Sequence, residues 1–220
     1  MEPEGGETPP TIATIRTAQR GNQRLVELTD GTHYVFATEA IDEAGVREGS
    51  VASPDLVAKL ESADRRAVVH EAALRLLATR ARSEQEMRTR LAMRGIDPEA
   101  IEHEIQRLLR SSLLDDSMFA HAWVRHRQQT APRSRRMLRH ELLGRGISPE
   151  SADEVTAELD DCATALEVAR RRAQSRLSEN YEQHLTKIGG FLRRRGFTYA
   201  ISSEAARQTW DEIEQDRSPA

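Results

Sequence analysis

The spacing of hydrophobic positions divides the chain into a short β-like part and a long helical part. Between Thr11 and Ala37, β-branched and aromatic residues recur with a period near two, and turn residues lie at 20–22 and at Asp30-Gly31. An Asp-Gly pair between two β-rich runs favours a two-residue hairpin turn in which both central residues take positive φ. The pattern therefore predicts a small β-meander, followed by a short helix over residues 39–45 that ends at Gly45.

Helical periodicity governs the rest of the chain. Ser53-Pro54-Asp55 combines an N-cap residue, a first-position proline and a first-turn acid, so a helix is predicted to begin there. From Asp64 onward the pattern is helical to the end, and the prolines lie only at predicted helix boundaries or in the tail.

The helical part repeats itself. Residues 82–99 recur at residues 133–150, 51 positions later, and a looser third copy covers residues 188–198. Each copy carries apolar pairs at i,i+4 and then a glycine where the helix ends and φ is expected to turn positive. These glycines are Gly95, Gly146 and Gly196. Asp97-Pro98 and Ser148-Pro149 then restart the chain as N-cap and first helical residue.

Adding the helix ahead of each copy, over about residues 65–80, 116–130 and 161–178, gives three three-helix units. The sequence thus predicts a mainly α protein, built of tandem three-helix repeats that form an elongated, curved array, with a small N-terminal β-meander. The expected parts are a disordered tail (1–10), a β-rich domain (11–62) and three-helix repeats over 63–112, 113–160 and 161–217.

Charge is segregated along the 220 residues, although the net charge is only −4. Residues 1–62 hold 5 basic and 11 acidic residues, whereas residues 121–147 hold seven arginines and one acid. Arginine runs this dense exceed what local i,i+4 acids are expected to neutralise, and arginine suits bidentate contact with phosphate or carboxylate. The candidate binding face comprises Arg133, Arg135, Arg136, Arg139, Arg170, Arg171, Arg172, Arg193, Arg194 and Arg195. Arg82 and Arg94, repeated at Arg133 and Arg145, are alternatively explained by repeat architecture.

Catalytic chemistry is not evident. Asp115-Asp116 resembles a metal-binding or proton-transfer pair, but a helix cap at the start of the next helix explains it better. His121, His126 and His140 lie among arginines, which disfavours cation binding, and Cys162 follows two acids, a poor setting for a thiolate. We therefore expect no enzyme activity, no catalytic residue, no metal and no cofactor.

Aromatic residues and hydropathy add two expectations. Phe119 and Trp123, like Phe191 and Phe197, are candidates for base stacking, but the first two lie at helical spacing beside small apolar residues and are predicted to be core. No apolar run approaches the ~20 residues that span a bilayer, and the N-terminus is acidic. The expectation is a cytoplasmic monomer that does not contact membranes.

Several of these segments together resemble the RecX family of regulatory proteins, over about residues 65–210. The resemblance rests on Arg82-Ser83-Glu84, Arg94-Gly95-Ile96, Leu113-Leu114-Asp115-Asp116 with Phe119-Ala120, and Arg193-Arg194-Arg195-Gly196-Phe197. It implies tandem three-helix modules and a protein that binds the RecA recombinase filament on single-stranded DNA. It further implies inhibition of the recombinase's ATPase, strand-exchange and co-protease activities.

On this interpretation the array lies in the filament groove, and the arginine face approaches DNA phosphates or acidic loops, so that single-stranded DNA is contacted directly or through the filament. The alternative is a sequence-specific transcription regulator of helix-turn-helix type, which the glycine-containing turns between helices permit. Specific duplex binding without recombinase would distinguish that alternative.

Overall fold

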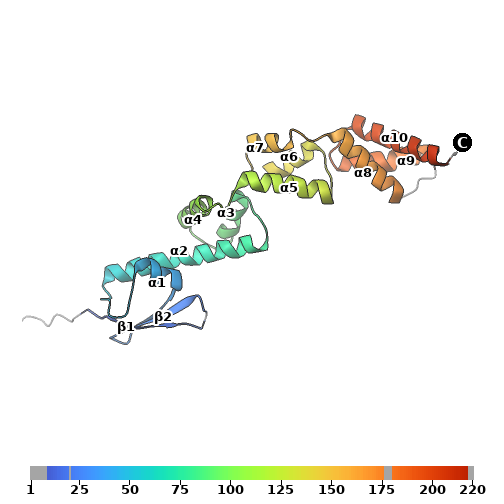
Figure 1. Ribbon diagram of the computed structural model, residues 1–220. Helices are drawn as coiled ribbons and strands as arrows, with labels where there is room; N and C mark the ends of the chain where they lie inside the picture. Colours follow the sequence, from blue (N-terminus) through green and yellow to red (C-terminus); the bar gives the residue numbers. More distant parts are fainter. Residues whose placement is uncertain (1–8, 20, 176–179, 218–220) are drawn as a thin grey trace, which may run out of the picture. The chain divides into compact units, whose positions relative to one another are not determined.

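The computed structural model describes residues 9–19, 21–175 and 180–217. The expected tail at 1–10 lies almost wholly outside these residues, as do residue 20 of the first turn and the end of the helix expected at 161–178. The protein is mainly helical, with tandem three-helix bundles and a small N-terminal antiparallel sheet, which confirms the predicted class (Figure 1). The chain divides into two units, Met1–Ala81 with Met87–Ser111, and Arg82–Glu86 with Ser112–Ala220.

The first unit opens with the β-meander. Strands β1 (Ile12–Thr17), β2 (Gln23–Leu28) and β3 (His33–Ala37) pair in antiparallel order, and α1 (Thr38–Ala44) follows and ends at Gly45, at φ 66°. Val26, Phe36 and Ile41 are buried together with Leu60 of the next helix, which closes this small core. The meander and the short helix are thus confirmed.

The turn between β2 and β3 differs from the prediction. Gly31 takes a φ of 85°, but Asp30 does not take positive φ, so the turn is not the expected two-residue type. The Asp30 carboxylate accepts a hydrogen bond from the Thr32 backbone N–H at 2.8 Å, which holds Asp30 in an Asx turn and lowers the pKa of its carboxyl.

Helix α2 (Pro54–Thr79) runs without a break for 26 residues. It begins as predicted, with Ser53 accepting a hydrogen bond from the Leu56 backbone N–H. The separate helix expected over 65–80 is therefore the second half of this helix, and the expected boundary at residue 62 falls inside it. Helices α3 (Glu84–Ala92) and α4 (Pro98–Arg110) complete the first three-helix module.

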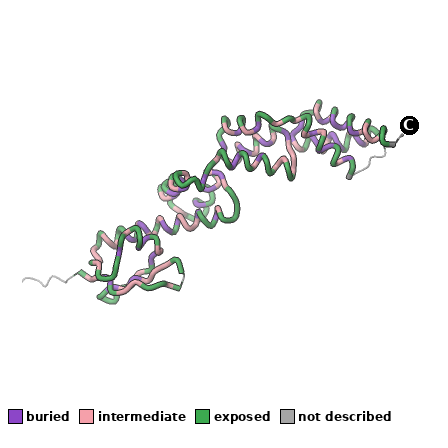
Figure 2. Tube along the Cα trace, viewed as in Figure 1, coloured by how far each residue is buried: buried purple, intermediate pink, exposed green. Residues whose placement is uncertain are grey.

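The second unit contains two further modules. The middle one consists of α5 (Asp116–Thr130), α6 (Arg135–Leu143) and α7 (Pro149–Thr156), and the last of α8 (Asp161–Ser175), α9 (Tyr181–Arg194) and α10 (Tyr199–Arg217). Each has its own core, around Leu138 and Leu142 in the middle module and around Ile188 and Leu192 in the last. Buried residues recur along these helices between exposed ones (Figure 2). The described residues include no helix with the length and apolar character of a bilayer span.

The last module also buries a histidine. His184 is fully buried, with its Nε2 3.0 Å from the Thr209 hydroxyl and its ring edge-on to Trp210. Burial lowers the pKa of His184, and a weaker backbone contact from Ala206 opposes that effect. The unfolded chain therefore takes up a proton more readily than the folded one, so this contribution to stability is present above the ordinary pKa near 6.5 and is lost as the pH falls below it.

We expect the free energy of unfolding to fall between about pH 7 and about pH 5, and His184→Gln to flatten part of that slope. Urea unfolding followed by circular dichroism at several pH values measures it. His33→Gln, at an exposed strand position, is the control and should keep the wild-type slope. An unaltered slope in His184→Gln would show that the buried imidazole does not contribute.

Candidate functional site

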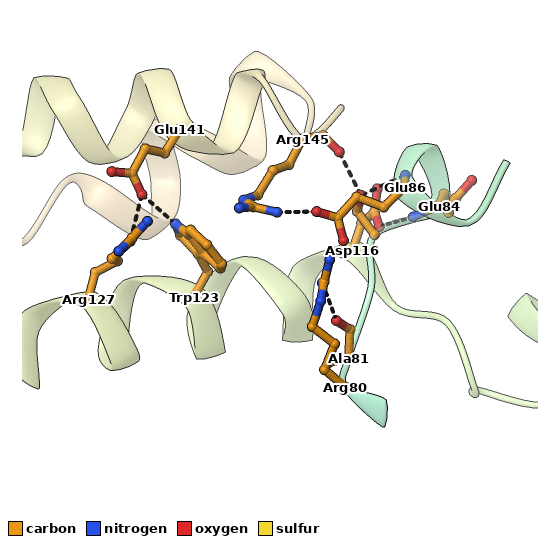
Figure 3. Close-up of polar contacts among 10 residues, drawn as sticks. Arg80, Ala81, Glu84, Glu86, Asp116, Trp123, Arg127, Glu141 and Arg145 are labelled. Atoms are coloured by element: carbon orange, nitrogen blue, oxygen red, sulfur yellow. Dashed lines mark hydrogen bonds and ion pairs between the residues drawn. The ribbon is translucent and has the colours of Figure 1, made fainter. Parts of the chain in front are cut away.

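The repeated Arg-Gly turns hold the starts of earlier helices, and two such contacts occur within the second unit. At the first junction, Ser83 accepts a hydrogen bond from the Glu86 backbone N–H at 3.2 Å and donates one to the Arg145 carbonyl at 2.6 Å. Asp116 accepts a hydrogen bond from the Glu84 backbone N–H at 2.8 Å (Figure 3). A serine and an aspartate thus accept hydrogen bonds from two of the backbone N–H groups that have no partner within the helix at its start, and the Arg-Gly turn holds the serine in place.

The second junction uses equivalent residues, but there the serine donates to the turn through its backbone N–H instead of its hydroxyl. Ser134 accepts a hydrogen bond from the Met137 backbone N–H at 3.2 Å, and the Ser134 backbone N–H donates to the Arg195 carbonyl at 3.1 Å. Asp161 accepts from the Arg135 backbone N–H at 2.7 Å. The internal repeat therefore encodes a docking geometry as well as a helix pattern.

The glycine of each turn has a second role at these junctions. Gly146 and Gly196 have φ of 83° and 91°, as the repeat predicted. A Cβ on Gly146 would lie 2.2 Å from the Gln85 Cβ, and one on Gly196 would lie 2.5 Å from the Ser134 Oγ. Gly95 has the same backbone conformation, with φ 73°, but a Cβ there would meet nothing within 4 Å. At Gly146 and Gly196 two constraints therefore require glycine, the positive φ and the close approach of a neighbouring side chain. At Gly95 only the positive φ applies.

The two aspartates of each adjacent pair, Asp115-Asp116 and Asp160-Asp161, have different roles. Asp115 caps its own helix by accepting from the Met118 backbone N–H at 2.9 Å, and Asp160 does the same for Cys162 at 2.8 Å. The second aspartate of each pair acts at a junction, as described above. The cap interpretation of Asp115-Asp116 is confirmed, and the described part of the chain has no group of three or more His, Cys, Asp or Glu side chains that could hold a metal ion.

Acidic side chains neutralise the arginines of the first junction (Figure 3). Arg145 pairs with Glu86 and lies 3.6 Å above the centroid of the Trp123 ring. Arg127 pairs with Glu141 at 2.8 Å, and the Trp123 indole N–H donates to the same carboxylate at 2.9 Å. Trp123 and the buried Phe119 are thus packed within the module, as predicted.

The second junction has no acid at either of the equivalent positions. Counting along the repeat, Met137 takes the place of Glu86, and Phe191 takes the place of Glu141. The guanidinium groups of Arg172 and Arg195 lie 4.8 and 4.2 Å from the Phe191 ring centroid. Burial, and then the charges of Arg133, Arg172 and Arg194, lower the pKa of Arg195. We call Arg133, Arg172, Arg194 and Arg195 the junction cluster.

One member of the junction cluster pairs with an acid of the middle module. Arg133 lies 2.5 Å from Glu141, the carboxylate that also binds Arg127. The Nε of Arg195 is buried and has no hydrogen-bond acceptor among the described residues. Like charges are thus gathered around Arg195, where the first junction places a carboxylate beside Arg145, and such a site gains from an external anion.

Other predicted arginines contact acids of their own module. Arg139 forms two hydrogen bonds to Asp153, at 2.5 and 3.1 Å, which raise the pKa of Arg139. Arg170 binds Glu212 at 2.6 and 3.0 Å, and Arg171 pairs with Glu167 one turn earlier. The expectation that local i,i+4 acids do not neutralise these runs was wrong at Arg171, whose acid lies one turn earlier on the same helix. Arg139 and Arg170 instead pair with acids of a facing helix.

The remaining predicted arginines are spread over separate surfaces. Arg135 donates to the Ala157 carbonyl at 3.3 Å, and Arg136 is exposed beside a shallow pocket that Met137 and His140 also line. Arg193 lies 6.0 Å from the centroid of the Tyr199 ring. The ten predicted residues thus lie in several separate patches. The junction cluster is the patch at which the repeat has Met137 and Phe191 in place of the two acids of the first junction.

Comparison with known proteins identifies the family. Residues 70–108 match the model of the first three-helix domain of RecX, and residues 115–155 match that of the second. A regulatory protein RecX from Corynebacterium efficiens is 33% identical over 185 residues, which cover 80% of this chain and 88% of that protein. The chain belongs to the RecX family of regulatory proteins. A RecX protein from Amycolatopsis mediterranei is 32% identical over 69% of this chain and 90% of its own length.

Solved RecX structures share the fold. A crystal structure of a regulatory protein RecX superposes with a TM-score of 0.69 at 21% identity, covering 92% of this chain and 99% of that one. RecX from Lactobacillus salivarius gives a TM-score of 0.57 at 23% identity, over 67% of this chain and 97% of its own. The RecX fold therefore extends beyond the two matched domains.

Sequence reasoning missed what distinguishes the two junctions of this RecX chain. The signal was present, because aligning the copies position by position sets Glu86 against Met137 and Glu141 against Phe191. The pairing of Arg170 with Glu212, 42 residues away, left no such signal.

Proposed function

We propose that this chain binds the RecA recombinase filament on DNA and inhibits the ATPase, strand-exchange and co-protease activities of the recombinase. Membership of the RecX family supports a regulatory role, and relatives are named regulatory proteins, which favours a function without catalysis. The observation that carries the proposal is the junction cluster, where arginines gather around Arg195 and where Met137 and Phe191 replace the two acids of the first junction.

Guanidinium groups at the cluster would contact phosphate oxygens of the filament DNA or carboxylates of the recombinase. Arginine forms bidentate contacts with both, and such charge-assisted hydrogen bonds are stronger than neutral ones. Inhibition then follows from occupancy, because a helical protein seated on the filament blocks duplex entry or biases the packing of protomers. No covalent step is required of this chain.

A titration of the DNA-dependent ATPase of the recombinase tests the proposal. We expect ATP hydrolysis on single-stranded DNA to fall as the chain is added, and the inhibition to weaken with salt because ion pairs are broken. Arg90→Gln removes one positive charge at an exposed position of α3 outside the junction cluster, and this variant should inhibit like the wild type. Unaltered hydrolysis and strand exchange at saturating protein would refute the proposal, and specific duplex binding without recombinase would favour the helix-turn-helix alternative.

A further inference from the structure

A groove between α9 and α10 is lined by aromatic, cationic and hydroxyl side chains. Its volume is about 610 Å³, within the range of ligand-binding sites. The lining side chains come from both helices, among them Tyr181, Arg193, Tyr199, Ser202, Ser203 and Arg207. All of these residues belong to the last module, so the groove is formed within one bundle.

Two tyrosines border the groove in different states. Tyr181 packs edge-on against Trp210, with ring centroids 5.8 Å apart, which fixes its position. Tyr199, by contrast, is 73% exposed at the first turn of α10, although large aromatic side chains are normally covered. The Tyr199 ring therefore offers an exposed planar face to a flat ligand, while the Tyr181 ring beside the groove is held in place by Trp210.

Positive charge accompanies the aromatic surface. The Arg193 guanidinium lies 6.0 Å from the Tyr199 ring centroid, and no ion pair joins Arg193 to a carboxylate among the described residues. Arg207 pairs with Glu204 at 2.8 Å, but both side chains are more than half exposed, so the pair is weak and exchanges readily. The groove can therefore accept an anion without breaking a buried ion pair.

A buried hydroxyl also lines the groove without a partner. Ser202 is 1% exposed, and its Oγ has no hydrogen-bond partner among the described residues. Buried polar atoms in folded proteins are nearly always paired, so this hydroxyl is an unsatisfied polar group in the wall of the groove. Beside it, Gly189 leaves the α9 side open, because a Cβ there would meet nothing within 4 Å.

We propose that this groove binds a nucleotide of single-stranded nucleic acid, with a base stacked on Tyr199 and the adjoining phosphates on Arg193 and Arg207. Aromatic stacking combined with a positively charged groove is how proteins bind single strands without sequence preference. An acidic peptide would supply charge but no base to stack on Tyr199. The inference rests on the proposed function, in which DNA is part of the target, and adds a direct contact to the strand.

Equilibrium binding of the full chain, without recombinase, tests the groove. Fluorescence anisotropy would compare a labelled oligothymidylate with an abasic strand of equal length, which keeps the phosphates and lacks the bases. We expect the wild type to bind oligothymidylate about tenfold more tightly, and Tyr199→Ala to remove that preference. Arg193→Gln should weaken binding to both strands and reduce the salt dependence by about 0.7 in slope.

Gly189→Leu provides a second variant that keeps the helix intact, since leucine is a better helix former than glycine. It should fill the groove and weaken oligothymidylate binding as Tyr199→Ala does. Met118→Ala, which trims a side chain that is 70% exposed on α5, and Arg90→Gln should leave the dissociation constant unchanged. Wild-type binding by both Tyr199→Ala and Gly189→Leu would overturn the proposal, as would equal wild-type affinity for the two strands or displacement by polyglutamate at equal charge.

The two proposals fail separately. A chain that prefers oligothymidylate over the abasic strand but leaves the recombinase ATPase unaffected would support the groove and refute the filament proposal. A chain that inhibits the recombinase but binds both strands equally would refute the groove and support the filament proposal.

Discussion

Gly146→Ala is expected to destabilise the second unit far more than Gly95→Ala destabilises the first, although both glycines occupy the same position of the repeat. Both have positive φ, which costs an alanine roughly 1–2 kcal/mol. At Gly146 the new Cβ would also lie 2.2 Å from the Gln85 Cβ. Because that atom adjoins the main chain and cannot swing away, the junction must open and strain its hydrogen bonds, for a total of roughly 3 kcal/mol or more.

Urea unfolding followed by circular dichroism measures the difference between these two variants. Gly196→Ala serves as a replicate, since its Cβ would lie 2.5 Å from the Ser134 Oγ and 2.7 Å from the Met137 Cβ. Gly95→Ala is the matched control, because its added methyl group meets open space. Equal losses of stability at Gly95 and Gly146 would mean that backbone conformation alone selects these glycines.

Met137→Glu should abolish much of the recombinase inhibition while leaving the fold stable. The substitution restores at the second junction the carboxylate that Glu86 supplies at the first, where it pairs with Arg145. An internal carboxylate beside Arg195 would compete with an external anion for the junction cluster. We expect the concentration needed for half-inhibition to rise by about tenfold and its salt dependence to fall by about one in slope.

Stability distinguishes this effect from misfolding. The free energy of unfolding of Met137→Glu should stay within about 1 kcal/mol of the wild type, because the new ion pair offsets lost apolar contacts. Met118→Glu makes the same chemical change at an exposed position near the start of α5, and it should inhibit normally. Full inhibition by Met137→Glu with an unaltered salt slope would exclude the junction cluster from the filament interface.

Local signals were sufficient to predict most of the helices. The caps at Ser53, Asp97 and Ser148 are where the sequence places them, since each depends only on residues within one turn. The continuity of α2 could also have been predicted from the sequence, because no glycine or proline interrupts residues 55–79. Charge composition suggested a domain boundary near residue 62 instead, but a change in charge does not end a helix.

The functional surface was harder to predict, because it depends on which acids fold back onto which arginines. Arg171 and Glu167 are one turn apart, so the spacing offered a signal for their pairing that the sequence analysis did not use. Arg139 and Asp153 lie on successive helices of one module, and Arg170 and Glu212 are on the first and third helices of another. Only the packing of the bundles brings these charges together.

The contacts that seat each Arg-Gly turn involve carbonyl and amide groups of the main chain, with serine and aspartate as the recurring side chains. Main-chain groups are the same whatever residue carries them, so side chains around the turn can change while these contacts persist, provided that the glycine and the capping serine and aspartate are kept. Duplicated modules are consequently free to diverge in electrostatic character without coming apart. One repeated helix trio can in this way support two connections of different charge in the same polypeptide.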